Sequence, residues 1–299
     1  MIELKKAITI EEQIALLKSR GMHFGNEALA KKLLSQIGYY RLSGYNLNFY
    51  KNPGVEDLFQ KGVTFEEVIQ SYLFDKELKG IFFQLFQTIE VRVRSYLILE
   101  ISIEYGADGW KNINLFVDEN EQSLQKKEKA TEDFERFQQK MSSELARSRE
   151  TFIIHHHRKY NSQFPVWVVA EIMSFGNISK LYKNMRTQNK KAIAKNYFLG
   201  SHYTFIQSWL EKIVNIRNIC CHHNRLINRE LACGKKTPAI KKYDAKGIFA
   251  YLLFIRDHFD IADDYAEFIN DLEKIFKKYP SVTPEVLDLP ANWLEILKV

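Results

Sequence analysis

The stretch FIQSWLEKIVNIRNICCHHNRLINR, residues 205–229, decides how the rest of this chain is interpreted. Its apolar side chains recur at alternating spacings of three and four residues, which predicts one buried helix face formed by Ile206, Trp209, Ile213, Ile216 and Cys220. A second column with this periodicity is entirely polar and consists of Glu211, Asn215, Asn218, His222, Arg225 and Arg229. The segment therefore predicts a long helix with one core-facing stripe and one continuous polar stripe.

The rest of the sequence also favours helices. Thr64 and Glu67 form the capping-box pattern of a helix start. No prolines interrupt the long periodic segments, and no stretch alternates with period two between hairpin turns. We expect an all-α fold with helices near residues 10–20, 27–37, 64–104 (broken near Gly80), 119–160, 166–186, 203–230, 245–257 and 262–278.

The length fits one large helical domain over residues 1–299. A sub-boundary is possible near 234–245, where the charge changes sign, with a core at 1–234 and a C-terminal helical extension at 245–299. Residues 118–150 are strongly polar, which predicts a helical insertion that is either an exposed arm or only partly ordered.

Positive charge is concentrated in one quarter of the chain. Residues 172–246 carry a net charge of +12, whereas residues 1–171 carry −1 and residues 247–299 carry −5. Residues 172–210 contain no acidic side chain at all. Such a patch on a near-neutral body is the expected footprint of a polyphosphate partner, although charge runs are also common on solvated helix faces. The candidate contacts in this segment are Lys180, Lys183, Arg186, Lys190, Lys191 and Lys195.

The sequence indicates a cytoplasmic protein without a membrane span. Its longest apolar run covers residues 248–255, whereas a bilayer needs about 20 residues. The first residues do not resemble a secretion signal. Three cysteines do not form a disulfide framework, and reduced thiols are the simplest interpretation.

The polar column carries groups suited to RNA chemistry. His222 can exchange a proton near neutral pH, and Asn218 lies one turn before it. Arg225 and Arg229 can hold phosphate oxygens in bidentate fashion. RNA supplies its own nucleophile, the 2′-hydroxyl, so cleavage needs only a base, an acid and positive charge. Histidine and arginine provide these without a metal or a cofactor, and we expect neither.

One histidine does not supply both acid and base, so a two-fold dimer that brings two copies of this helix together is expected. His223 follows Cys220 in phase with the apolar column, which favours a structural role for it. Residues 217 and 222 are separated by about 140° on an ideal helix. Arg217 must therefore swing inward to approach His222, or a facing subunit must complete the arrangement.

Several stretches resemble a known group of proteins. RNICCH, with Arg217 and His222 separated by four residues and Asn218 after the arginine, resembles the R-x(4–6)-H motif of HEPN ribonucleases. More broadly, the chain resembles bacterial abortive-infection proteins of the AbiD/AbiF type in IGYYRLSGYNLNF (37–49), FEEVIQSYLFDKEL (65–78), QTIEVRVRSYL (87–97), PVWVVAEIMSFGNISKLYKNM (165–185), RNICCHHNRLINR (217–229) and LPANW (289–293).

This resemblance implies an all-helical HEPN-like bundle that dimerises and cleaves RNA to a 2′,3′-cyclic phosphate, in phage defence or a toxin–antitoxin pair. It implies that Arg217 stabilises the phosphate, Asn218 positions groups and His222 acts as acid or base. His223 is an alternative, since an R-x5-H reading is also possible. A small noncoding RNA that restrains the protein is an expected partner.

Other motifs have more ordinary interpretations. His155, His156 and His157 are consecutive, so on a helix they point about 100° apart and do not chelate one ion as a set. Glu90 with Arg94 has the spacing of a modest helix salt bridge, and Asp75 with Lys79 has the spacing of a surface pair. The alternative for Glu90, Arg92 and Arg94 is an inward position near the 205–229 helix, because their own helix is very apolar.

Two functions from different classes remain open. The first is a metal-independent RNA endonuclease of the abortive-infection type. The second is a non-catalytic RNA-binding protein in which the same basic surface holds a structured RNA. Both predict RNA affinity that falls with salt. Only the first predicts that His222→Ala abolishes cleavage while RNA binding persists.

Overall fold

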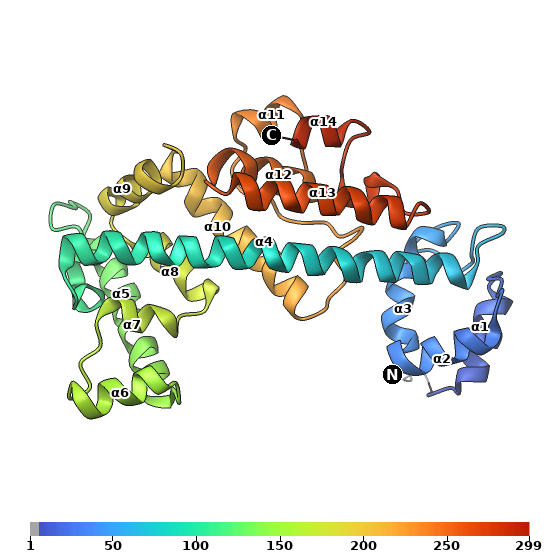
Figure 1. The fold of residues 1–299 in the computed structure, drawn as a ribbon, viewed down its shortest axis with the longest axis horizontal. Helices are drawn as coiled ribbons and strands as arrows, with labels where there is room; N and C mark the ends of the chain where they lie inside the picture. The colour runs from blue at the N-terminus through green and yellow to red at the C-terminus, as the bar shows by residue number, and fades with distance from the viewer. Residues whose placement is uncertain (1–5, 299) are drawn as a thin grey trace.

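The computed structural model describes residues 6–298, and within that range the chain forms α-helices and no β-strand (Figure 1). The expected all-α class is confirmed. The central element is α4 (Phe65–Tyr105), a single helix that runs along most of the length of the molecule. The capping box forms as predicted, because the Thr64 side chain accepts a hydrogen bond from the Glu67 amide and Glu67 caps the Thr64 amide.

The predicted break near Gly80 is wrong. Residues on both sides of Gly80 are apolar at helical spacing, so α4 buries a continuous face and tolerates one glycine. The helix ends only at Gly106, whose φ of 74° lies in the left-handed region that glycine adopts without strain.

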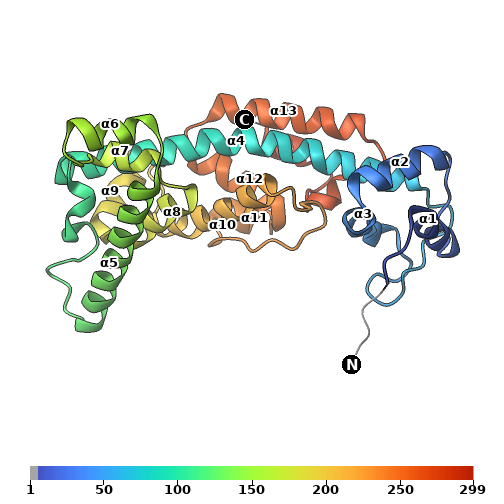
Figure 2. The same ribbon diagram turned by 90° about the horizontal axis from the view of Figure 1, so that it is seen from below.

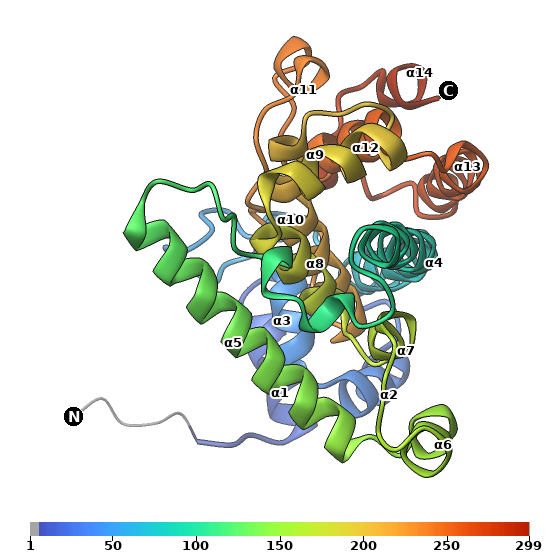
Figure 3. The same cartoon turned by 90° about the vertical axis from the view of Figure 1, so that its left-hand side faces the viewer.

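Two groups of helices occupy the ends of α4. Near its start lie α1 (Ile10–Ser19), α2 (Glu27–Ile37) and α3 (Tyr39–Asn46). Around its end gather α5 (Leu124–Arg147), α6 (Thr151–Lys159), α7 (Val166–Glu171), α8 (Phe175–Asn184) and α9 (Thr187–Tyr197). Figure 3 views this second group along the molecule, with α5 crossing the face of the end and α4 seen end-on.

The middle of α4 is covered by later helices. Both α10 (Tyr203–Cys221) and α13 (Ala262–Lys278) pack directly on it, and Figure 2 shows α13 running beside α4. The helix α12 (Gly247–His258) joins them through Trp209 of α10, whose ring stacks on Phe254 at 4.7 Å. The short helices α11 (Pro238–Lys242) and α14 (Trp293–Leu297) complete this layer. The region after residue 234 therefore shares its packing partners with the earlier helices.

Several predicted helix boundaries need correction. The predicted 166–186 helix is divided into α7 and α8, and the predicted 119–160 helix into α5 and α6. The insertion is a regular amphipathic helix, since α5 buries Phe134, Met141 and Leu145. The predicted 203–230 helix ends nine residues early, at Cys221. The helices α3, α9, α11 and α14 have no counterpart as separate helices in the sequence-based prediction.

Candidate functional site

The candidate site forms where α10 ends. His222 caps the helix, with its amide donating to the Asn218 carbonyl at 2.9 Å. His223 follows with a left-handed φ of 56°. The His223 amide donates to Cys220 O and the Asn224 amide to Ile219 O, which is the Schellman pattern of helix termination. The chain then leaves the helix direction.

This ending changes the interpretation of the polar column. Asn218 and His222 share one face at the end of α10, as predicted, but Arg225 and Arg229 lie beyond the helix. The interpretation of His223 as part of the apolar seam is wrong, because the helix has ended and its side chain is exposed. His222 is also exposed. Two neighbouring histidines are thus accessible at one helix end.

Hydrogen bonds between arginine or lysine side chains and backbone carbonyls attach the segment after the helix, residues 222–227, to α3 and α4. Arg41 of α3 donates from Nη1 to the His223 carbonyl at 2.8 Å. Lys79 of α4 donates from Nζ to the Asn224 carbonyl at 3.2 Å. In return, the Arg225 guanidinium donates to Gly44 O of α3. Arg225 is therefore half-buried in a structural contact, which leaves less of its guanidinium for RNA.

Asp75 is the centre of this attachment. Its side chain is fully buried. One carboxylate oxygen accepts from the Leu226 and Ile227 amides at 2.9 and 3.0 Å. The other accepts from the Tyr45 hydroxyl and from Lys79 Nζ, both at 2.7 Å. The prediction of a surface pair between Asp75 and Lys79 is therefore wrong, and Asp75 instead ties α3, α4 and the segment that carries His222 into one unit.

A second ionic cluster lies about one turn before the end of α10 and includes Arg217. Arg217 Nη2 lies 3.2 Å from Glu90 Oε2 on α4, and Arg217 Nη1 donates to Asn218 Oδ1 at 3.4 Å. Glu90 Oε1 also pairs with Arg94 at 3.3 Å. Glu90 is thereby confirmed to face α10, and it also forms the predicted salt bridge with Arg94, whereas Arg92 pairs with Asp264.

Arg94 extends this cluster to the turn between α7 and α8. Its Nη2 donates to the Met173 carbonyl at 3.1 Å, and its Nη1 lies 3.8 Å from the Glu171 carboxylate at the surface. Its buried Nε has no hydrogen-bond partner among the described residues. The cluster thus holds two guanidinium groups against two carboxylates, Glu90 and the exposed Glu171, so its charges balance, and the Arg217 guanidinium lies next to Asn218. Sequence spacing alone gave no signal for the Met173 contact.

The Cys220 thiol at this helix end does not suit nucleophilic chemistry. Cys220 is buried, and burial raises the pKa of its thiol to about 12. A thiol with so high a pKa stays protonated at neutral pH, and only a thiolate is an effective nucleophile. The exposed side chains with an exchangeable proton at this helix end are the two histidines.

The predicted RNA contacts divide into free and engaged side chains. Lys180, Lys183, Lys191, Lys195 and Arg229 are exposed. Lys190 is buried, with its ammonium donating to Lys183 O and Gln207 Oε1 at 3.0 Å each, and burial lowers its pKa. Periodicity could not reveal this, because α9 presents three lysines close together in sequence but buries only one.

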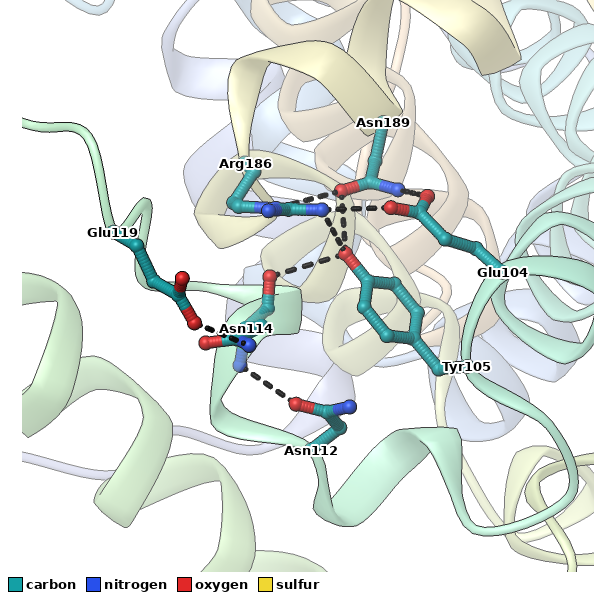
Figure 4. A network of polar contacts seen from close by, with 7 residues as sticks. All are labelled: Glu104, Tyr105, Asn112, Asn114, Glu119, Arg186 and Asn189. Atoms are coloured by element: carbon teal, nitrogen blue, oxygen red, sulfur yellow. Dashed lines mark hydrogen bonds and ion pairs between the residues drawn. The ribbon is translucent and has the colours of Figure 1, made fainter.

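Arg186 belongs to a polar network that joins the end of α4 to the start of α9 (Figure 4). Its Nη2 lies 2.6 Å from both Glu104 Oε1 and the Tyr105 hydroxyl, whose oxygen is also 3.0 Å from Asn189 Oδ1. Burial raises the pKa of Tyr105 to about 12. Asn189 is fully buried and donates back to Glu104. Arg186 thus has a structural role in addition to any contact with RNA.

The three histidines of α6 make separate contacts. His156 Nδ1 lies 2.9 Å from Gln163 O, and His157 Nδ1 lies 2.8 Å from Ser162 Oγ. Across residues 6–298, no three His, Cys, Asp or Glu side chains gather closely enough to hold a metal ion. None of the helices in this range is long and apolar enough to cross a membrane.

Comparison with known families bears directly on this region. Residues 32–228 match the family described as Abi-like protein. The chain belongs to this family. The matched part contains Asp75, Glu90, Arg217 and both candidate histidines, so the two ionic clusters described above lie within the Abi-like region. Neither the curated proteins nor the solved structures gave a match. Membership suggests a role in abortive infection.

Proposed function

We propose that this Abi-like protein is a metal-independent RNA endonuclease that acts in abortive infection or a related toxin–antitoxin system. The observation that carries the proposal is the arrangement at the end of α10. There the exposed His222 stands one turn after Asn218, beside a cluster in which Arg217 and Arg94 share Glu90. An imidazole that can exchange a proton and a guanidinium that can bind phosphate are thus close together.

In the proposed reaction, the RNA 2′-hydroxyl attacks the adjacent phosphorus and the 5′-oxygen leaves, which gives a 2′,3′-cyclic phosphate. His222 removes the proton from the nucleophile or donates one to the leaving oxygen. Arg217 binds the phosphate as negative charge develops on it. Asn218 orients the imidazole or a ribose hydroxyl. The second proton-transfer group comes from a second copy of the chain in a two-fold dimer.

The test uses purified wild-type protein, His222→Ala and His223→Ala with total RNA in EDTA, followed by mapping of the new RNA ends. We expect cyclic-phosphate ends from wild type and a loss of roughly 10²–10⁴-fold in His222→Ala, the usual size of an acid–base contribution. Cleavage that requires added divalent metal, or that is unchanged in His222→Ala, would contradict the mechanism.

The proposed RNA cleavage also depends on whether the protein dimerises and whether an RNA inhibits it. We propose that a small noncoding RNA restrains the protein and that the dimer is the active form. Sedimentation of wild type with and without co-purified RNA tests both points. A monomer with full cleavage activity would remove the requirement for a dimer.

A second candidate is a non-catalytic RNA-binding protein. It is favoured by the pairing of Arg217 with Glu90 at 3.2 Å, which is an ordinary structural use of an arginine. In that case, wild-type protein freed of bound RNA retains tight RNA affinity but leaves the RNA intact, and His222→Ala changes neither property.

A further inference from the structure

A cationic groove lies between α5 and α8, outside the candidate site. Its cavity measures about 420 Å³. Five basic side chains line it, against the single carboxylate of Asp133. The five are Lys129, Arg136, Lys140, Lys180 and Lys183. A hollow with this excess of positive charge concentrates anions, because the low-dielectric walls focus the field.

One wall of the groove is a single face of α5. Lys129, Asp133, Arg136 and Lys140 are separated by four, three and four residues, so they follow one line along the helix. The adjacent line buries Phe134 and Met141 and so holds α5 in place. Asp133 contacts Arg136 at 2.7 Å and Lys129 at 3.6 Å, which orients these two cations without matching the charge of the whole wall.

The opposite wall belongs to α8 and has no acidic residue. Lys180 and Lys183 are exposed, one turn apart. Neither these two nor Lys140 has a carboxylate within 4.0 Å in the described part of the chain. Asn177 and Asn184 add amide groups at the two ends of this wall. Three unpaired ammonium groups therefore face one hollow from two helices.

The lining of the groove is partly aromatic. Phe116 and Phe137 lie there with ring centroids 5.5 Å apart, and Phe137 is partly accessible. A basic groove with aromatic side chains is the usual means of binding single-stranded nucleic acid. The cavity is far too small for a duplex but is comparable to one nucleotide, with neighbouring phosphates reaching the lysines on either side.

The helix α8 connects this groove to the α10 region. It follows α8, whose first turn meets α10: a Cβ placed on Gly176 would lie 3.8 Å from Val214. Val214 precedes Arg217 by one turn. A strand lying along α8 would therefore reach the α10 helix near Asn218.

We propose that the α5–α8 groove is a binding site for the phosphate backbone of single-stranded RNA. Its role in delivering RNA for cleavage rests on the proposed nuclease function, but binding itself does not. In this proposal the polar insertion has a function in RNA binding, since the charged face of α5 forms one of the two walls of the groove.

The test measures affinity for a short, fully 2′-O-methylated RNA, which lacks the nucleophile and cannot be cut by this chemistry. The triple variant Lys140→Ala, Lys180→Ala, Lys183→Ala is expected to bind about tenfold more weakly or worse at about 100 mM salt. Its slope of log affinity against log salt should flatten by about 2, since each single-strand phosphate contact contributes about 0.7.

The matched control is Lys32→Ala, Lys51→Ala, Lys61→Ala. It makes the same change in net charge at exposed positions near the other end of α4. We expect wild-type affinity and slope. Equal weakening in both triple variants would overturn the proposal, because net charge alone would then explain binding. A groove variant that binds like wild type would overturn it as well.

Two further outcomes distinguish an RNA-strand site from a nucleotide site, and the groove proposal from the nuclease proposal. If wild type binds a free nucleotide as tightly as the oligonucleotide, the site is not one for an RNA strand and the proposal fails. If the groove variant loses binding to the uncleavable RNA while wild type leaves total RNA intact, the groove assignment stands and the nuclease proposal fails.

Discussion

At the scale of single residues, the left-handed backbone of His223 allows a substitution that tests which of the two candidate histidines is needed for cleavage. A non-glycine residue at a φ of 56° is strained by about 1 kcal/mol, and glycine relieves this strain at the end of a helix. His223→Gly is therefore expected to leave stability unchanged within about 1 kcal/mol and to keep RNA cleavage. His222→Ala should lose cleavage with no loss of stability, since its ring is exposed. Assays of cleavage and of thermal unfolding on both variants check this, and loss of cleavage only in His223→Gly would reverse the assignment.

The buried Asp75 carboxylate accepts four hydrogen bonds, from α3, α4 and the segment after α10. Asp75→Asn keeps the shape but removes the charge that Lys79 pairs with, and it turns an amide donor toward other donors. We expect a loss of roughly 3 kcal/mol in the free energy of unfolding, as when one partner of a buried ion pair is removed.

Denaturant titration of Asp75→Asn measures this loss, and hydrogen exchange at the Leu226 and Ile227 amides should accelerate. The exposed Asp263→Asn serves as the control, with an expected change below about 1 kcal/mol. A variant at Asp75 as stable as wild type would show that the four hydrogen bonds it accepts contribute little.

At the scale of elements, α4 is continuous through Gly80, and this makes a simple prediction. Gly80 is exposed, and a Cβ added there would meet nothing within 4 Å. Gly80→Ala should therefore raise the free energy of unfolding by about 0.5–1 kcal/mol, because alanine loses less backbone entropy in a helix. Chemical denaturation detects such a change, and a destabilised Gly80→Ala protein would mean that the helix bends there in solution.

Element types could be predicted from sequence, but several ends could not. Periodicity identified α1, α2, α4, α10, α12 and α13, because each buries a regular apolar stripe. It extended α10 to residue 230, since Leu226 and Ile227 are as apolar as a helix would need. Their burial instead comes with backbone hydrogen bonds to Asp75, a contact between residues far apart in sequence. No local pattern shows such a contact.

The candidate site, too, could be predicted from the sequence only in part. Asn218 and His222 share a face as their spacing predicted, because both remain within the last turns of α10. The partnership of Arg217 with Glu90 depends on how two helices cross, and their packing is decided by the whole core. Likewise, the charge excess at residues 172–246 was visible in the sequence, but only tertiary structure shows that Lys190 is buried.

At the scale of the whole molecule, acid should destabilise the fold through His258. This ring packs against Phe254 at 4.5 Å, and its Nε2 is buried with no hydrogen-bond partner among residues 6–298. Burial lowers the pKa of His258, only partly opposed by Asp257. The unfolded chain therefore binds this proton more readily than the folded one, so stability is full above about pH 6.5 and falls as pH drops toward the lowered folded pKa.

Thermal unfolding of wild type and His258→Gln between about pH 7.5 and 5.5 measures this dependence. We expect the wild-type protein to lose more stability across this interval than the variant, which has no titrating ring at that position. Parallel curves for the two proteins would show that His258 charges as easily in the folded state as in the unfolded one.

The continuity of α4 also fixes a length. Asp75 and Glu90, which hold two different parts of the α10 region, sit on one straight rod about 22 Å apart. Inserting a single residue between them would rotate one anchor by about 100° relative to the other and break one of the two attachments. The spacing between the two anchors is therefore fixed. Substitutions at exposed positions of α4 leave this spacing unchanged, whereas an insertion or a deletion between Asp75 and Glu90 does not.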